Sequence, residues 1–274
     1  MLPVVLGLSA GISWGIADFF GGLASRRGRV AACVAAAQLA GLLLLGAVLA
    51  ARRTGPPPAD EIVLGLVAGA FSALGLVAFY RGLAVGAMSL VAPVASVGAV
   101  VPLASGLASG ERPSPLAGIG VAAALAGTVL VARARGPLAP RGLGLALLAA
   151  AGFGGFLAII APAAETDQVW AVTASRVTAV PLVAGAALAS GGALTVTRGQ
   201  LPLVLAAGVL DSLANLLYAV GTQRGLVSLV AVLASLYPVA TVVLARTVLG
   251  ERVTGAQGAG IALALGGVAL IAAG

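Results

Sequence analysis

Long apolar runs separated by short polar breaks fill almost the whole chain. Ten such runs lie near residues 3–24, 30–51, 61–80, 87–109, 115–133, 141–162, 168–189, 200–220, 226–249 and 255–273. Each run is close to the roughly 20 residues that a helix needs to cross a bilayer. The breaks between them carry most of the charges and many of the prolines and glycines. The pattern predicts an all-α integral membrane protein with ten transmembrane helices.

Composition supports this class and excludes several kinds of chemistry. Hydrophobic residues make up 61% of the chain and charged residues 8%, whereas a soluble domain carries roughly a quarter charged residues. The chain has no Lys and no His, and Cys33 is its only cysteine. These absences exclude a P-loop lysine, the usual zinc sites and an intrachain disulfide. We therefore expect no enzymatic activity, no metal and no cofactor.

The net charge of +7 comes from 15 arginines, most of which lie in the short breaks. Arginines in that position are typical of membrane-topology signals. We expect contacts with membrane lipid and a small-molecule substrate, and no binding of nucleic acid. The sequence leaves open whether the protein is a monomer or a homodimer.

The chain contains an internal repeat, which appears when it is shifted by 139 residues. The shift aligns rare polar residues, placing Ser89–Ala92 on Ser228–Ala231, Ser96 on Ser235 and, after one inserted residue, Gly110–Arg112 on Gly250–Arg252. Apolar composition alone does not keep Ser, Glu and Arg in one register. Five helices per copy is an odd number, so the second copy enters the membrane from the opposite side. Such inverted repeats are typical of secondary transporters with a substrate site near the membrane midplane.

The sequence resembles the ten-helix, EamA-like members of the drug/metabolite transporter superfamily. Four features carry this resemblance: Trp14–Gly15 in the first run, the two five-helix halves, the Gly-Glu-Arg that ends the fourth and ninth runs, and the glycine-spaced run after each. The resemblance implies EamA-like repeats at residues 1–136 and 137–274, with a central cavity between them. It also implies transport of amino-acid-like or drug-like solutes, often outward, and cytoplasmic termini.

Asp18 is the only charged residue of the first run. A charge near the bilayer centre costs about 2.5–3.5 kcal/mol on insertion scales, so its presence needs a reason. One interpretation is a carboxyl group that faces the cavity and exchanges protons or binds substrate. The other is a paired or protonated structural Asp. The repeat places Leu157 opposite Asp18, which favours a special role for the carboxyl group.

A polar stripe marks the eighth run. Asp211, Asn215 and Tyr218 are spaced i, i+4, i+7 and therefore share one helical face. We expect this face to look into the cavity. The alternative is hydrogen bonding between helices, in which Asn and Tyr serve packing.

Arg176 lies well inside the seventh run, and its guanidinium cannot lose its charge. It needs a carboxylate partner, an anionic substrate group or a short path to water. Asp18 and Asp211 are the intramembrane carboxylates available to it. The alternative is that the helix begins later than drawn and that Arg176 extends to the interface.

Two aromatic residues complete the set of candidate cavity residues. Trp14 lies about one turn before Asp18, and Tyr237 precedes Pro238, whose missing N–H can open a helix. Packing and bending are the alternative interpretation of both. We interpret the two Gly-Glu-Arg motifs as structural, since a negative charge such as that of Glu111 suits the N-terminus of the helix that follows.

Glycines at four-residue spacing, Gly7, Gly11 and Gly15, mark the first run. Small residues at this spacing predict the close approach of another helix.

Orientation is a point of conflict between the resemblance and the charges. With a cytoplasmic N-terminus, the outward loops hold Arg26, Arg27, Arg29, Arg81, Arg133, Arg135, Arg141, Arg198 and Arg252, and the inward loops hold Arg52, Arg53, Arg112 and Arg224. The positive-inside rule favours the reverse arrangement. We keep cytoplasmic termini and expect a multi-pass protein of the cytoplasmic membrane.

Taken together, these features predict a secondary transporter of a small organic metabolite. We expect an exporter that works by alternating access and is coupled to protons. A facilitator or exchanger of amino-acid-like solutes fits the same fold. A membrane-embedded lipid flippase, or another membrane protein that is not a transporter, is the alternative.

Overall fold

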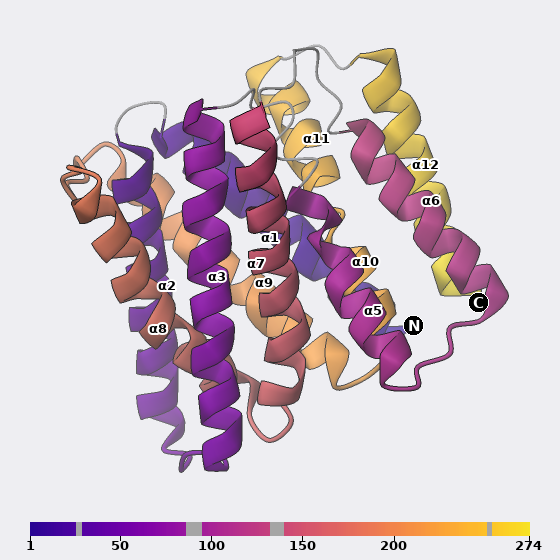
Figure 1. Cartoon of the computed structure of the whole chain (residues 1–274), viewed down its shortest axis with the longest axis horizontal. Helices are drawn as coiled ribbons and strands as arrows, with labels where there is room; N and C mark the ends of the chain where they lie inside the picture. Colours follow the sequence, from indigo (N-terminus) through magenta and orange to yellow (C-terminus); the bar gives the residue numbers. More distant parts are fainter. Residues whose placement is uncertain (26–28, 86–94, 132–139, 251–253) are drawn as a thin grey trace.

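The computed structural model describes residues 1–25, 29–85, 95–131, 140–250 and 254–274, and every regular element in these ranges is a helix. The elements are α1 (Leu2–Ser25), α2 (Val30–Arg52), α3 (Ala59–Val85), the 3₁₀-helix η1 (Val97–Ala99), α5 (Val100–Ala108), α6 (Pro115–Val131), α7 (Pro140–Ala163), α8 (Gln168–Ala189), α9 (Leu201–Thr222), α10 (Val227–Ala234), α11 (Tyr237–Leu249) and α12 (Gly255–Ala273). Figure 1 shows them as a bundle whose helices run roughly from top to bottom of the view, across the longest axis of the molecule.

Within the described ranges, eight stretches are long and apolar enough to cross a membrane, counting α10 and α11 as one. Two shorter apolar helices, at Val97–Ala108 and Pro115–Leu130, accompany them. The prediction of an all-α, multi-span membrane protein is confirmed. The chain therefore crosses the bilayer many times, with short connections at both ends.

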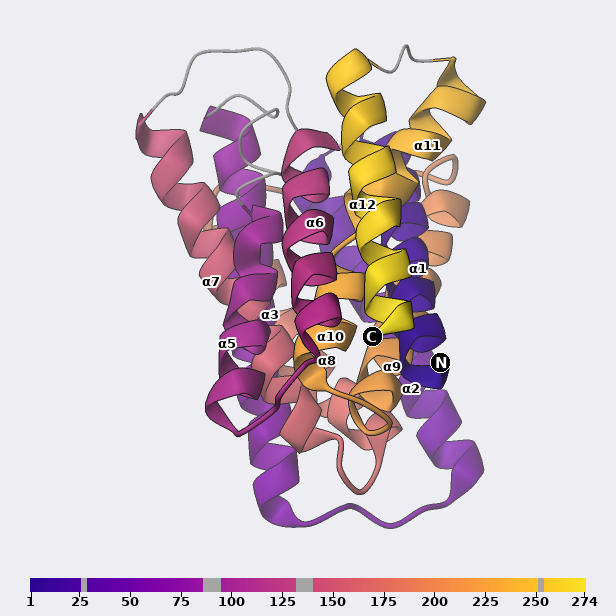
Figure 2. The same cartoon turned by 90° about the vertical axis from the view of Figure 1, so that its right-hand side faces the viewer.

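The bundle has an upper and a lower end, which are defined by the first three helices. The upper end is where α1 finishes and α2 begins, and the lower end is where α2 finishes and α3 begins (Figure 1). Helices α6 and α12 lie side by side at one edge, and the two chain termini lie near each other (Figure 2). Ser114, at the start of α6, caps this helix by accepting a hydrogen bond from the N–H of Ala117 at 3.1 Å.

The glycine spacing of α1 allows close packing. A Cβ atom added at Gly11 would lie 2.8 Å from the carbonyl oxygen of Ala234, and one at Gly15 would lie 2.6 Å from that of Tyr237. These distances are too short for a side chain, so only glycine lets α1 pack this tightly against α10 and α11. The predicted approach of another helix to this face of α1 is confirmed.

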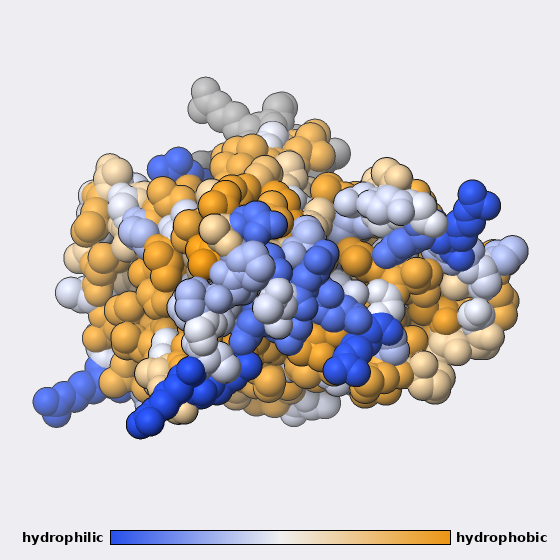
Figure 3. Space-filling view, turned by 90° about the horizontal axis from the view of Figure 1, so that it is seen from below, coloured by the Kyte–Doolittle hydropathy of each residue, from blue (hydrophilic) through white to orange (hydrophobic). Residues whose placement is uncertain are grey.

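The outer surface of the bundle is apolar along its length. Leu43, Ile119 and Leu147 keep 64%, 61% and 56% of their surface exposed, as expected for side chains that face lipid. Seen from the lower end, hydrophilic surface gathers over the middle and hydrophobic surface lies along the flanks (Figure 3). This distribution fits a chain that meets water at its ends and hydrocarbon around its sides.

Candidate functional site

A cavity lies in the middle of the bundle and holds about 840 Å³ of empty space, counting the solvent at its mouth. Side chains from α1, α2, α3, α7, α8, α9 and α11 line it, together with residues around η1. Its wall includes six of the seven predicted site residues, namely Trp14, Asp18, Arg176, Asp211, Asn215 and Tyr237. Most of the residues predicted from the sequence therefore lie on this wall, although they form only a third of it.

Arg176 and Asp211 form an ion pair between α8 and α9. The guanidinium Nη2 of Arg176 donates to Oδ2 of Asp211, and the indole Nε1 of Trp14 donates to Oδ1 of the same carboxylate at 3.1 Å. The Arg176 side chain is only 4% exposed, against 27% for Asp211. Helix α8 begins at Gln168, two turns earlier, so the alternative in which Arg176 reaches the interface is wrong. Its charge is balanced inside the bundle.

Asn215 lies one turn after Asp211 on α9 and is hydrogen-bonded to its backbone. Its Nδ2 donates to the backbone carbonyl oxygen of Asp211 at 2.6 Å, and its side chain is buried. The helix explains this contact, since residues four apart lie one above the other on the same face. Asp211 is thus held by three helices, through Arg176, Trp14 and its own neighbour on α9.

Asp18 differs from Asp211 in having no such support. It is exposed within the bundle, and it lines both the central cavity and a second cavity described below. In the part of the chain that the structure describes, no hydrogen bond or ion pair reaches its carboxylate. Asp211 and Tyr237 line the same cavity as Asp18. Among the described residues, Asp211 therefore has charged and hydrogen-bonding partners, whereas Asp18 has none.

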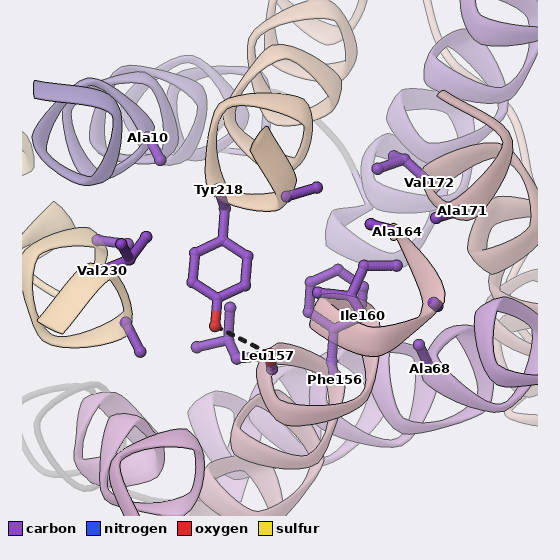
Figure 4. Packing of buried hydrophobic residues seen from close by; sticks show 14 of the residues in the cluster. Ala10, Ala68, Phe156, Leu157, Ile160, Ala164, Ala171, Val172, Tyr218 and Val230 are labelled. Atoms are coloured by element: carbon purple, nitrogen blue, oxygen red, sulfur yellow. Dashed lines mark hydrogen bonds between the residues drawn. The ribbon is translucent and has the colours of Figure 1, made fainter. Parts of the chain in front are cut away.

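Tyr218 corrects the prediction of a continuous polar face on α9. It is fully buried and does not line the cavity. Its hydroxyl group donates to the carbonyl oxygen of Leu157 on α7 at 2.9 Å, as Figure 4 shows. The cavity ends below Asn215 because α7 packs against α9 there. Tyr218 thus follows the packing alternative, with its ring centroid 6.0 Å from that of Trp14.

Tyr237 lies where its sequence suggested an opened helix. α10 ends at Ala234 and α11 begins at Tyr237, so Ser235 and Leu236 interrupt the span. Ser235 lines the cavity at this break, and its hydroxyl group donates to the carbonyl oxygen of Val232 at 2.7 Å. The break exposes polar atoms to the cavity in the middle of an otherwise apolar helix.

Several cavity residues were not singled out from the sequence. They are mostly apolar or aromatic and include Ser72, Leu76, Phe79, Phe153, Phe156 and Ser96. Ser72, Leu76 and Phe79 are spaced i, i+4, i+7 and share one face of α3. This face has one polar residue, whereas the corresponding face of α9 has three. The repeat carried a usable signal for Ser96, because it aligns with Ser235 and also lies at a break, just before η1. It carried one for Phe153 as well, which the shift of 139 residues aligns with Trp14.

Hydrogen bonds close the lower end of the bundle beneath the cavity. The carboxylate of Glu111 accepts from the backbone N–H groups of Val227 at 2.6 Å and Ser228 at 3.0 Å. The amide of Gln223 donates to the carbonyl oxygen of Ala161 at 2.7 Å. The interpretation of Glu111 as a charge for the next helix, α6, is wrong, because its carboxylate caps α10 instead. The matching Glu251 lies outside the described residues.

A second, smaller cavity leads from Asp18 toward the upper end. It holds about 530 Å³ of empty space, counting the solvent at its mouth, and shares four lining residues with the central one: Asp18, Gln38, Leu76 and Asp211. Gly21, Ser25 and Cys33 line its remaining part. Asp18 therefore lies where two cavities meet.

Comparison with known proteins now supplies the family. The model of the EamA-like transporter family matches residues 1–133 and, a second time, residues 140–273. The chain belongs to the EamA-like transporter family. The resemblance to the drug/metabolite transporter superfamily is thereby confirmed, and the family is one of membrane transporters of that kind.

Two further comparisons complete this finding. No curated protein matches the sequence of this EamA-like transporter. A crystal structure described simply as that of a protein is 22% identical to it, covers 98% of this chain and 95% of the other, and superposes with a TM-score of 0.81. At that identity the likeness shows a shared fold, which extends over nearly the whole chain.

Proposed function

We propose that this EamA-like transporter is a secondary transporter that moves a small organic solute by alternating access and is coupled to protons through Asp18. The observation that carries the proposal is the Asp18 carboxylate, which lies on the wall of a central cavity and has no hydrogen-bond or ion-pair partner among the described residues. A proton-coupling group must be free to gain and lose its proton during the cycle. Asp211 does not meet this requirement, because Arg176 holds it in an ion pair.

Two inverted five-helix repeats, at residues 1–136 and 137–274, form the second part of the proposal. Packing between the helices supports them: α3 lies along α7 and α8, as α9 lies along α1 and α2, and α6 packs against α12. A shift of 139 residues places α1, α2, α3 and α6 on α7, α8, α9 and α12. The packing of α3 against α7 and α8 therefore corresponds to that of α9 against α1 and α2, and the pair of α6 and α12 corresponds to itself. The double match of the family model supports the same division. Rocking of one half against the other then exposes the cavity to alternate sides.

The conformation described here supports such a cycle. The cavity residues on α1 and α3, such as Asp18 and Phe79, lie in the portions of these helices nearer the upper end. The lower end is closed by the bonds of Glu111 and Gln223. We propose that this is one end state, and that the opposite state breaks the lower contacts and forms new ones above.

We further propose that the protein lies in the cytoplasmic membrane and exports its solute, with both chain ends in the cytoplasm. Alkaline phosphatase and green fluorescent protein, each fused after Gly274, test the orientation. A bright fluorescent fusion with inactive phosphatase supports it. An active phosphatase with a dark fluorescent fusion reverses it.

Proteoliposomes that enclose a pH-sensitive dye test the transport function. A panel of small amines, amino acids and carboxylates is added outside, and both solute uptake and internal pH are recorded. We expect at least one solute to move together with a change in internal pH. The Asp18→Asn variant should lose the pH change, and Asp60→Asn, an exposed acid in the first turn of α3, should keep it. Transport that ignores the pH gradient and survives Asp18→Asn would refute proton coupling.

A further inference from the structure

The charges on the cavity wall favour one chemical class of substrate. Three charged side chains line the cavity among the described residues: Asp18, Arg176 and Asp211. Arg176 and Asp211 cancel each other in their ion pair, which leaves the negative charge of Asp18. The wall therefore presents a net charge of −1 when Asp18 is ionised.

The positive and negative side chains of the wall also differ in how easily a ligand can reach them. The guanidinium that would have to receive a substrate carboxylate belongs to a side chain that is 4% exposed and already engaged with Asp211. Asp18 is exposed to the cavity and has no partner in the described ranges. A ligand cation can thus reach its counter-charge directly. A ligand anion meets only Arg176 among the described residues, and there Nη2 is already engaged with Asp211 while the unpartnered Nε is buried. Burying an unpaired carboxylate is costly.

A second polar group that lines the same cavities offers an unpartnered hydrogen-bond acceptor. The Oε1 atom of Gln38 is buried and has no hydrogen-bond partner among the described residues. Gln38 lines the same two cavities as Asp18. An ammonium group has only donors to offer, so the exposed carboxylate of Asp18 suits it, and the unpartnered oxygen of Gln38 adds a buried acceptor beside the same cavities.

Aromatic rings form much of the remaining wall. Phe79 and Phe153 meet with ring centroids 5.9 Å apart, and Trp14, Phe156 and Tyr237 line the same cavity. The faces of such rings attract cations and also bury apolar surface.

We infer that the substrate is an amphipathic monocation, that is, one ammonium group on an apolar or aromatic body without a carboxylate. Asp18 binds the ammonium group, and the aromatic wall receives the body. This inference rests on the proposed function and narrows it, because it disfavours the zwitterionic amino acids that the family resemblance suggested.

Four ligands that share one phenyl-ethyl body test the inference. They are phenethylamine as the cation, phenylalanine as the zwitterion, 3-phenylpropionate as the anion and 2-phenylethanol as the neutral compound. Binding of each to the purified full-length protein is measured by isothermal titration calorimetry at neutral pH. We expect phenethylamine to bind at least tenfold more tightly than the zwitterion and the anion. Equal or tighter binding of either, or no binding of the amine, overturns the inference.

Variants separate charge recognition from loss of structure. Asp18→Asn should reduce the affinity for phenethylamine at least tenfold and leave 2-phenylethanol unchanged, with an unaltered size-exclusion profile. Asp60→Asn, the matched acid outside the cavity, should bind all four like the parent protein. An Asp18→Asn protein that still prefers the amine overturns the inference. Tight amine binding without any transport in proteoliposomes contradicts the proposed function instead, so the two failures are distinguishable.

Discussion

The ion pair between Arg176 and Asp211 should dominate the response of the bundle to charge removal. Asp211→Asn leaves a guanidinium that is 4% exposed without a counter-charge. Breaking a buried pair in this way costs about 3–5 kcal/mol. Water in the cavity reaches Asp211, which is 27% exposed, so we expect the lower end of that range, about 3 kcal/mol. At about 2–4 °C per kcal/mol for a chain of this size, the melting temperature should fall by about 6–12 °C.

Three further variants make this prediction specific. Asp18→Asn removes the unpaired acid and should lower the melting temperature by less than about 3 °C, in keeping with a cost under about 1 kcal/mol. Arg176→Gln leaves the more exposed partner behind and should cost less than Asp211→Asn. The double variant Arg176→Gln with Asp211→Asn leaves no unpaired charge, so it should be more stable than the sum of the single losses predicts.

Stability is measured as the fraction of purified protein that remains monodisperse on size exclusion after heating in detergent. Strict additivity of the two single losses would mean that the ion pair is not formed. An Asp211→Asn protein as stable as Asp18→Asn would show that Arg176 has another partner.

Three other changes probe packing and closure. Tyr218→Phe removes the bond to Leu157 and should cost about 1 kcal/mol without changing solute affinity, because Tyr218 lies outside the cavity; a large affinity loss in the calorimetric assay would contradict this placement. Gly11→Leu places a side chain where an added Cβ would lie only 2.8 Å from a carbonyl oxygen, so the purified variant should no longer be monodisperse on size exclusion. Gly46→Leu, with open space around the added side chain, should remain monodisperse. Glu111→Gln weakens the charge-assisted cap of α10, so the state with a closed lower end and a cavity open toward the upper end becomes less populated. A small thiol reagent should then label Cys33, which lines the second cavity, more slowly. Unchanged or faster labelling would argue against closure by Glu111.

Span positions were predictable because apolar length is a local property. The seventh run, 168–189, coincides with α8 at Gln168–Ala189, and the tenth, 255–273, coincides with α12 at Gly255–Ala273. The glycine spacing in α1 was equally readable, because small residues four apart mark one face whatever lies opposite. These features depend on neighbours within one helix.

Contacts between distant helices were beyond the pattern. Arg176 had two possible partners, and only the packing of α8 against α9 selects Asp211. Tyr218 shares a helical face with Asn215, but the position of α7 decides that one meets a carbonyl group and the other the cavity. Glu111 bonds to Val227, 116 residues further along the chain. No local rule reports such a distance.

The contacts at α1 and at Glu111 differ in how water affects them. Where Gly11 meets Ala234, backbone lies against backbone and leaves no space for solvent. At the lower end, each bond of Glu111 joins groups that water can hydrate equally well. Opening this end therefore exchanges one hydrogen bond for another at small enthalpic cost. Water molecules are therefore taken up when the lower end opens. Solutes that lower the activity of water should favour the closed lower end.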